Sequence, residues 1–273
     1  MNLLIFSANW YNRGDESAIR AMIDEMRIVF PDCHIKIHFN QPVKEIPYDD
    51  IEILNPFIRC AGRNIFKNIF YNLALRTNGK IPYIGADAAN FRAFVDAVKW
   101  ADYAIYAPGG PCIGDYYNVR RLLLDIIEII LRNGVPYSLF APSVGPFSVD
   151  EKRVKYLIDQ AKVVCFRESI SQGYYAALSP EKKTTVTLDS AFQHEIDLKE
   201  NRNKLDGYKE LSDFLKKSEK VIGITVTDLK WHRKYRESDI NITISNTFHE
   251  FLQYIEGKGY SVLFIPQLFG ANN

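Results

Sequence analysis

The sequence predicts an α/β protein whose first part folds as a doubly wound parallel sheet. Segments rich in β-branched and aromatic residues alternate with segments whose apolar residues recur at helical spacing. This alternation is typical of βα units on a parallel sheet. The 273 residues correspond to one large or two ordinary domains, at roughly 150 residues per domain.

The predicted elements follow one another along the first part of the chain. Short apolar and aromatic runs indicate strands at 2–8, 34–39, 103–107, 136–141, 163–166 and 184–188. Helical periodicity indicates helices at 16–29, 91–100, 119–132, 151–160 and 169–177. We therefore expect a first domain that spans residues 1–196.

A charged segment, EIDLKENRNK at 195–204, predicts a linker after this domain. Residues 197–273 then show the pattern of one βαβ unit, with helices at 207–216 and 241–257 and strands at 221–227 and 261–266. Most sheets have about five or six strands. We therefore expect either an incomplete second α/β unit or one whose strands join the first sheet.

Composition excludes several classes of protein. Hydrophobic residues make up 47% and charged residues 25% of the chain, which excludes disordered and collagen-like proteins. The net charge of +1 argues against non-specific binding of nucleic acid. The four cysteines form no C-x-x-C pair, which argues against a zinc site or a disulfide framework and favours a reducing cytoplasm. The sequence has neither a basic N-terminal region nor an apolar run of about 18 residues, so we expect neither secretion nor a membrane span.

Candidate site residues lie in the turns after strands, because open α/β sheets bind ligands beyond the carboxyl ends of their strands. After the first strand, the turn with Asn12, Gly14 and Asp15 opens a helix, and the N–H groups there can hold an anion. Capping of that helix by Asp15 is the alternative. Gly109 and Gly110 let a ligand approach the backbone closely, although a simple tight turn explains them equally.

Three further charged residues follow strands. Asp115 offers a carboxylate near Gly109 and Gly110. Arg167 can bind a phosphate or a carboxylate bidentately, and a salt bridge to Glu168 or Asp189 is the competing explanation. Asp189 has the pattern of either a helix cap or a catalytic group.

The stretch 63–80 is both basic and apolar, like an amphipathic helix that lies on an anionic membrane. Packing of this helix on the rest of the domain is the alternative.

Six short motifs occur in a fixed order: NRGDE at 12–16, GGPCIGD at 109–115, SVGP at 143–146, FRES at 166–169, LDSAF at 188–192 and VIGITV at 221–226. With these motifs the chain resembles the polysaccharide pyruvyl transferases. The resemblance implies two facing Rossmann-like domains, similar to GT-B glycosyltransferases. It also implies transfer of pyruvate from phosphoenolpyruvate onto two sugar hydroxyls as a ketal, in exopolysaccharide or cell-wall synthesis.

The same resemblance implies roles for individual residues. The donor would be bound by Gly14, Gly109, Gly110, Arg167 and Ser169. Asp15 and Asp115 would act on the acceptor hydroxyls, and Asn12, Tyr116 and Asp189 would bind the acceptor. No metal or other cofactor is expected.

Family members usually continue further and supply an Arg/His stretch from the second domain, so we expect the C-terminal part, with the general acid, to be missing here. The expected partners are phosphoenolpyruvate and a saccharide acceptor, which can be lipid-linked, and a second copy of the chain. The expected location is the cytoplasm, with membrane contact through 63–80. Two alternatives stay open: a GT-B-type glycosyltransferase that uses a nucleotide sugar, and an inactive fragment or binding module.

Overall fold

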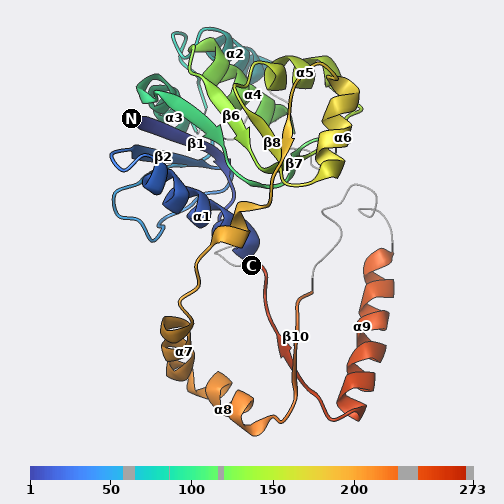
Figure 1. The fold of residues 1–273 in the computed structure, drawn as a ribbon. Helices are drawn as coiled ribbons and strands as arrows, with labels where there is room; N and C mark the ends of the chain where they lie inside the picture. Colours follow the sequence, from blue (N-terminus) through green and yellow to red (C-terminus); the bar gives the residue numbers. More distant parts are fainter. Residues whose placement is uncertain (58–64, 86, 116–119, 227–238, 269–273) are drawn as a thin grey trace. The chain divides into compact units, whose positions relative to one another are not determined.

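The computed structural model describes residues 1–57, 65–85, 87–115, 120–226 and 239–268 (Figure 1). The chain divides into two compact units, Met1–Gln193 and His194–Asn273. The boundary predicted from the sequence, after residue 196, lies a few residues further along the chain.

A seven-stranded parallel sheet forms the centre of the first unit. Its strands are, in spatial order, β3 (Glu52–Leu54), β2 (His34–Phe39), β1 (Asn2–Ala8), β4 (Tyr103–Tyr106), β6 (Tyr137–Phe140), β8 (Val164–Phe166) and β9 (Thr185–Val186). The order runs outward from β1 in both directions, so the predicted doubly wound α/β fold is confirmed.

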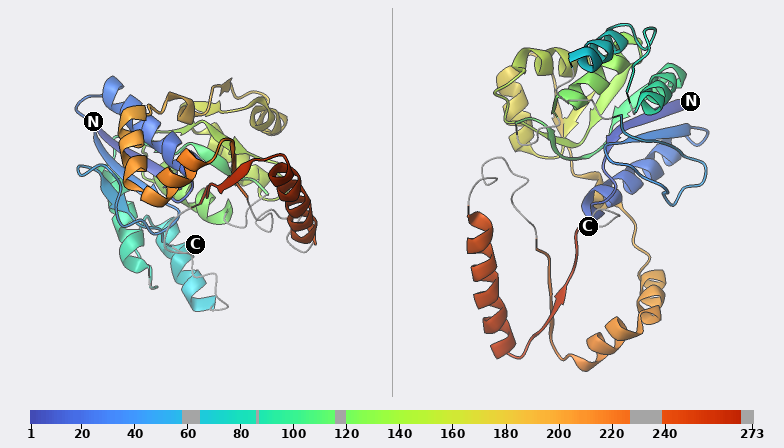
Figure 2. Two further views of the ribbon diagram at one scale, coloured as in Figure 1. Left: turned by 90° about the horizontal axis from the view of Figure 1, so that it is seen from below. Right: turned by 180° about the vertical axis from the view of Figure 1, so that it is seen from behind.

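Helices cover both faces of this sheet (Figures 1 and 2). The helices of the first unit are α1 (Arg13–Val29), α2 (Ile65–Arg76), α3 (Ala88–Trp100), α4 (Arg120–Arg132), α5 (Glu151–Asp159), α6 (Ser169–Leu178) and the short 3₁₀ turn η1 (Ser190–Gln193). One continuous apolar core joins β1, β4 and β6 to α2, α3, α4 and α5. Helix α1 packs on the opposite face, where Ile19, Met22 and Ile23 are fully buried.

Strands β4 and β6 bend at their carboxyl ends and continue in a second, smaller sheet. Ala141, at the bend after β6, has a φ of 52°. The continuations are β5 (Gly109–Ile113) and β7 (Pro142–Val144), which pair with each other in parallel. This small sheet carries Gly109 and Ser143, so both residues leave the plane of the main sheet at its carboxyl edge.

A buried histidine supports the end of β1. The N–H of Ser7, whose φ is 63°, donates to Nδ1 of His38 at 3.4 Å. The His38 ring packs against Phe57 and Phe94, with ring centroids 5.7 and 4.8 Å away. Burial lowers the pKa of His38 to about 3, so the ring is neutral at physiological pH.

The second unit contains one βαβ unit and two preceding helices. Its elements are α7 (Leu198–Gly207), α8 (Lys209–Lys217), β10 (Val221–Ile224), α9 (Ile240–Gly257) and β11 (Ser261–Phe264). Strands β10 and β11 pair in parallel in a sheet of their own, so among the described residues these strands do not join the first sheet. An apolar hollow between α9 and the end of β11 is lined by Phe248, Leu252 and Phe264.

The segment 195–204, predicted as a linker from its composition, includes most of helix α7, which the sequence did not predict. The side chain of Asp197 accepts the N–H of Glu200 at 2.8 Å and caps the helix. Lys204 and Glu200 form an i,i+4 ion pair at 2.6 Å. Helix capping and charge pairing therefore stabilise a helix that has no buried residue.

Candidate functional site

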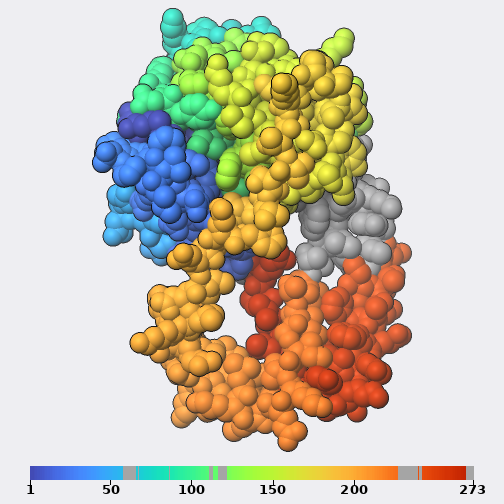
Figure 3. Space-filling model, in the orientation of Figure 1, coloured from blue at the N-terminus to red at the C-terminus, as the bar shows by residue number. Residues whose placement is uncertain are grey.

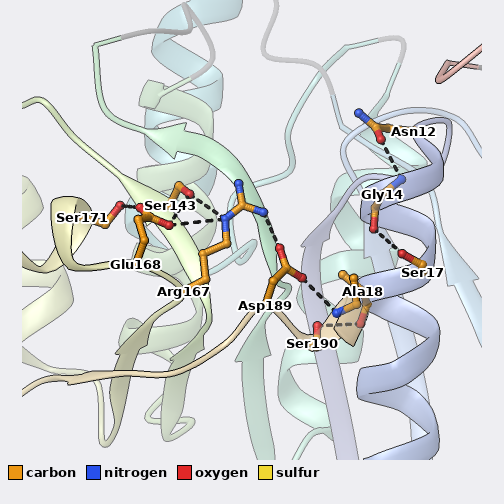
Figure 4. Close-up of polar contacts among 11 residues, drawn as sticks. Asn12, Gly14, Ser17, Ala18, Ser143, Arg167, Glu168, Ser171, Asp189 and Ser190 are labelled. Carbon is orange, nitrogen blue, oxygen red and sulfur yellow. Dashed lines mark hydrogen bonds and ion pairs between the residues drawn. The ribbon is translucent and has the colours of Figure 1, made fainter. Parts of the chain in front are cut away.

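The candidate site lies at the carboxyl edge of the first sheet, where Arg167 and Asp189 form an ion pair (Figure 4). The charges of both act on Asp15. Asp15 belongs to the first turn of α1, which follows β1. Arg167 follows β8, and Asp189 follows β9. The carboxyl ends of parallel strands share one edge, so residues 174 positions apart in sequence meet here.

The first turn of α1 is capped by Asn12. Its Oδ1 accepts the N–H of Gly14 at 2.9 Å, and the carbonyl of Gly14 accepts from Ser17 Oγ at 2.9 Å. The expected alternative, a cap made by Asp15, is therefore wrong. The cap also occupies the backbone N–H of Gly14 that was predicted to bind the donor.

The carboxylate of Asp15 lies against the Gly109–Gly110 backbone. Gly109 has a φ of 145°, and a Cβ there would lie 3.0 Å from Asp15 Oδ1. Burial raises the pKa of Asp15 to about 6. The charge of Arg167 and the Gly110 N–H oppose this rise, whereas Asp189 adds to it. Asp15 can therefore gain or lose a proton near neutral pH.

The guanidinium of Arg167 is held on two sides. Its Nε donates to Ser143 Oγ at 2.7 Å, and its Nη1 donates to Asp189 Oδ2 at 2.6 Å (Figure 4). Glu168 Oε2 lies 3.5 Å from Nε. The salt bridges expected as the competing explanation are thus present, but Arg167 also acts on the pKa of Asp15. Its side chain keeps 27% of its surface exposed, so a ligand can reach it.

Sequence reasoning named Glu168 and Asp189 as partners of Arg167 but missed the two serines that complete the group. Ser143 Oγ donates to Glu168 Oε2 at 3.0 Å, and Ser171 Oγ donates to the other oxygen of the same carboxylate. The buried Ser171 hydroxyl also accepts the N–H of Val144 at 2.8 Å. These bonds tie Arg167 to β7 and to the first turn of α6. The signal in the sequence was the Ser143 of SVGP, which directly follows a strand.

Asp189 is a cap, one of the two alternatives that the sequence left open, and it also bonds to Arg167. Its Oδ1 accepts the N–H of Ala191 at 3.0 Å, which caps η1, while its Oδ2 bonds to Arg167. The next residue, Ser190, is buried and donates to the carbonyl of Ala18 at 2.9 Å. Helix α1 and the segment after β9 are thereby joined, so Asp15 and Asp189 share one rigid support.

The remaining predicted residues lie around this centre. Asp115 lies two residues after β5 and is half-buried, and its N–H donates to the carbonyl of Pro146 at 3.0 Å. Ser169 is the first residue of α6 and is exposed. Tyr116 lies outside the described residues. In the described part of the chain, no three His, Cys, Asp or Glu side chains gather as a metal site.

Comparison with known proteins gives one clear match. A family model described as polysaccharide pyruvyl transferase matches residues 12–267. The chain belongs to this family. The match begins at Asn12 and includes every residue of the site described above. The site is therefore part of the region that the chain shares with this transferase family.

Two further comparisons add less. A search of curated proteins gives no match. An E. coli structure described as trehalose-6-phosphate bound with UDP-2-fluoro glucose matches at 13% identity, with a TM-score of 0.40, over 99% of this chain and 74% of that one.

Proposed function

We propose that this protein transfers the pyruvyl group of phosphoenolpyruvate to two hydroxyls of a saccharide. The proposal is supported by membership in the pyruvyl transferase family and by the Asp15–Arg167–Asp189 cluster at the carboxyl edge of the sheet. The observation that carries it is the pairing of a fixed, partly exposed arginine with a carboxyl group that titrates near pH 6.

The reaction requires both a cationic group and a group that accepts a proton. The methylene carbon of phosphoenolpyruvate gains a proton, and C2 forms bonds to two sugar oxygens while its bond to the phosphate oxygen breaks. Of the two hydroxyl protons that are released, one balances the proton taken up by the methylene carbon and the other leaves with inorganic phosphate. Catalysis therefore needs cations for the donor and a base for the hydroxyls.

Arg167 binds the donor in this proposal. Phosphoenolpyruvate carries a carboxylate and a phosphate, and a guanidinium can bind either with two parallel hydrogen bonds. Ser143 and Asp189 occupy the Nε and one Nη1 hydrogen of the five N–H donors. They hold the guanidinium in one orientation before the donor arrives, which reduces the entropy lost on binding. Asp189 is then a positioning residue rather than an acceptor ligand.

Asp15 accepts the proton of the attacking hydroxyl. A group with a pKa of about 6 is mostly ionised at pH 7, yet it is more basic than an ordinary carboxylate. Gly109 has no side chain, so the acceptor can approach Asp15 along the backbone of β5. The Gly110 N–H fixes the carboxylate from the other side.

The test is an assay of phosphate release from phosphoenolpyruvate with a panel of saccharides, with the pyruvyl ketal identified by mass spectrometry. Arg167→Ala should lower turnover about tenfold or more, since a charge-assisted hydrogen bond contributes roughly 1.5–3 kcal/mol. Arg167→Lys should recover only part of the loss, because an ammonium lacks the planar fork.

Arg27→Ala is the matched control. Arg27 bonds to Asp50 at 2.6 Å, so the variant also loses an arginine–carboxylate pair, but on the far part of α1. Turnover of this variant should stay within about twofold of wild type, as expected for an exposed pair. Transfer of a sugar from a nucleotide sugar in the same assay, without use of phosphoenolpyruvate, would refute the proposal.

A further inference from the structure

Helix α2 has an exposed apolar stripe on its outer side. Phe66, Ile69, Phe70 and Leu73 follow the i, i+3, i+4, i+7 spacing of one helix face, and all four are exposed, Phe66 to 74%. Ile84, beyond the end of the helix, is exposed as well. Soluble proteins rarely present large apolar side chains grouped in this way unless the surface binds something.

The other side of α2 packs on the first unit. Tyr71, Ala74 and Leu75 belong to its core, and the hydroxyl of Tyr71 donates to Asp125 of α4 at 3.0 Å. The sequence left packing and membrane contact as alternatives for this helix. In the structure, packing on the domain uses the buried face of α2 and leaves the outer stripe exposed.

Helix α2 is the outermost element on its side of the unit. Figure 2 shows it in teal, outside the layer that contains α3 and α4, and Figure 3 shows the same colour at the upper margin of this unit. The amide of Asn78 donates to the carbonyl of Arg132 at 3.1 Å, which fixes the end of the helix against α4. The stripe is therefore presented by a fixed helix and not by a loose end.

The described charged side chains at the end of α2 are basic, since Arg76 and Lys80 are exposed there. In the sequence, the stretch between Glu52 and Asp87 has no Asp or Glu, and its basic residues are Arg59, Arg63, Lys67, Arg76 and Lys80. Two acids of α4, Asp125 and Glu128, are bonded to Arg153 at 2.6 and 2.5 Å, so their charge is largely neutralised.

We propose that α2 docks on the surface of an anionic phospholipid bilayer. An apolar face that includes two phenylalanines, flanked by basic residues, matches an interface with acyl chains below and negative headgroups beside it. The helix has 12 residues, whereas a span needs about 20, so it lies along the membrane surface. In the described residues, no helix is both long and apolar enough to cross a bilayer.

The experiment measures binding of the whole protein to vesicles of phosphatidylcholine alone and of phosphatidylcholine with phosphatidylserine, by flotation. Wild type should bind the anionic vesicles and should bind neutral vesicles about tenfold less tightly or worse. Phe66→Ser combined with Phe70→Ser should lower binding about tenfold or more. Arg76→Gln combined with Lys80→Gln should lower binding to anionic vesicles alone.

The matched control is Ile28→Ser combined with Ile170→Ser. These two apolar residues are also exposed, but they lie on α1 and α6 of the same unit and not on α2. This variant should bind vesicles like wild type. Circular dichroism and thermal melting of every variant should show an unchanged fold, since all substituted side chains are exposed.

Three results would overturn the proposal. The first is absence of binding to anionic vesicles at low salt, and the second is equal loss of binding in the control variant. The third is a wild-type oligomer in light scattering that becomes monomeric in the Phe66→Ser, Phe70→Ser variant, because the stripe would then join two copies of the chain.

Discussion

The carboxylate of Asp15 lies in tight contact with the position that a Cβ on Gly109 would take. A Cβ built on Gly109 would lie 3.0 Å from Asp15 Oδ1 and 3.6 Å from Asp15 Cγ. Gly109 also has a φ of 145°, a conformation that residues with a side chain rarely adopt. Two separate features therefore favour glycine at position 109: its own backbone conformation and the position of the Asp15 carboxylate.

Replacement of Gly109 by alanine should damage the site. The variant must strain its backbone, at a cost of about 1–3 kcal/mol, and must also push the carboxylate of Asp15 away from Arg167. We expect a lower melting temperature together with a loss of turnover about tenfold or greater, measured by thermal melting and by phosphate release.

Gly110→Ala is the control for this prediction. A Cβ on Gly110 meets no heavy atom within 4 Å, and alanine keeps the N–H that bonds to Asp15. Its stability should change by no more than about 0.5 kcal/mol. A Gly110 variant as damaged as the Gly109 variant would show that the Asp15 contact is not the cause.

Asp15→Asn should stabilise the protein while it abolishes turnover. The pKa of Asp15 is about 6 in the folded chain and 3.8 for an ordinary aspartate, as in the unfolded chain, so the folded form binds the extra proton between these values. Stability is therefore lost as pH rises from 3.8 to 6, by about 3 kcal/mol in total. Asparagine resembles the protonated acid and avoids this loss. Melting temperature should rise at pH 7 and change little at pH 4, and a destabilised variant at pH 7 would contradict the assignment.

Removal of the positive charge beside Asp15 should raise its pKa further. Arg167 lowers the pKa of Asp15, whereas burial and Asp189 raise it. In Arg167→Ala the carboxyl should therefore titrate above pH 6, as measured by NMR of its carboxyl carbon in both proteins. In Arg167→Lys the value should stay near that of wild type. An unchanged titration in the alanine variant would show that the two groups are not coupled.

His38 should make the free energy of unfolding depend on pH. Its pKa is about 3 in the fold and 6.5 for an ordinary histidine, as in the unfolded chain, so the unfolded chain binds the extra proton between these values. The contribution of His38 is fully present above pH 6.5 and decreases as pH falls toward 3, by about 1.4 kcal/mol per pH unit. His38→Phe removes this dependence and keeps a ring beside Phe57 and Phe94. Denaturation at pH 7.5 and pH 5 should show a difference between wild type and variant that changes by about 2 kcal/mol, and parallel pH profiles would contradict it.

Much of the first unit could be predicted from the sequence, because its strands and helices are long or strongly patterned. Strands β1 and β2 begin and end where apolar runs predicted them. Strands β3, β5 and β7 were missed because they have three to five residues, and β5 begins with two glycines, which disfavour strands. Helix α7 was missed because it buries nothing, so no apolar periodicity marks it.

For the site, the strand ends could be predicted from the sequence, but the hydrogen bonds could not. The predicted turn residues Asp15, Arg167 and Asp189 come together because parallel strands present their carboxyl ends on one side. The hydrogen bonds of Ser171 could not be predicted, because they depend on the packing of α6 against β7. The cap by Asn12 in place of Asp15 likewise depends on local backbone geometry, since both side chains cap helices well.

The central claim is that Arg167 and its neighbours bind phosphoenolpyruvate. Isothermal titration calorimetry of phosphoenolpyruvate into wild type, Arg167→Ala and Arg27→Ala tests it most directly. We expect one saturable site in wild type and in Arg27→Ala, with affinity about tenfold lower or worse in Arg167→Ala. Equal affinity in all three proteins, or no binding of phosphoenolpyruvate where UDP-glucose binds at the same concentrations, would contradict the account.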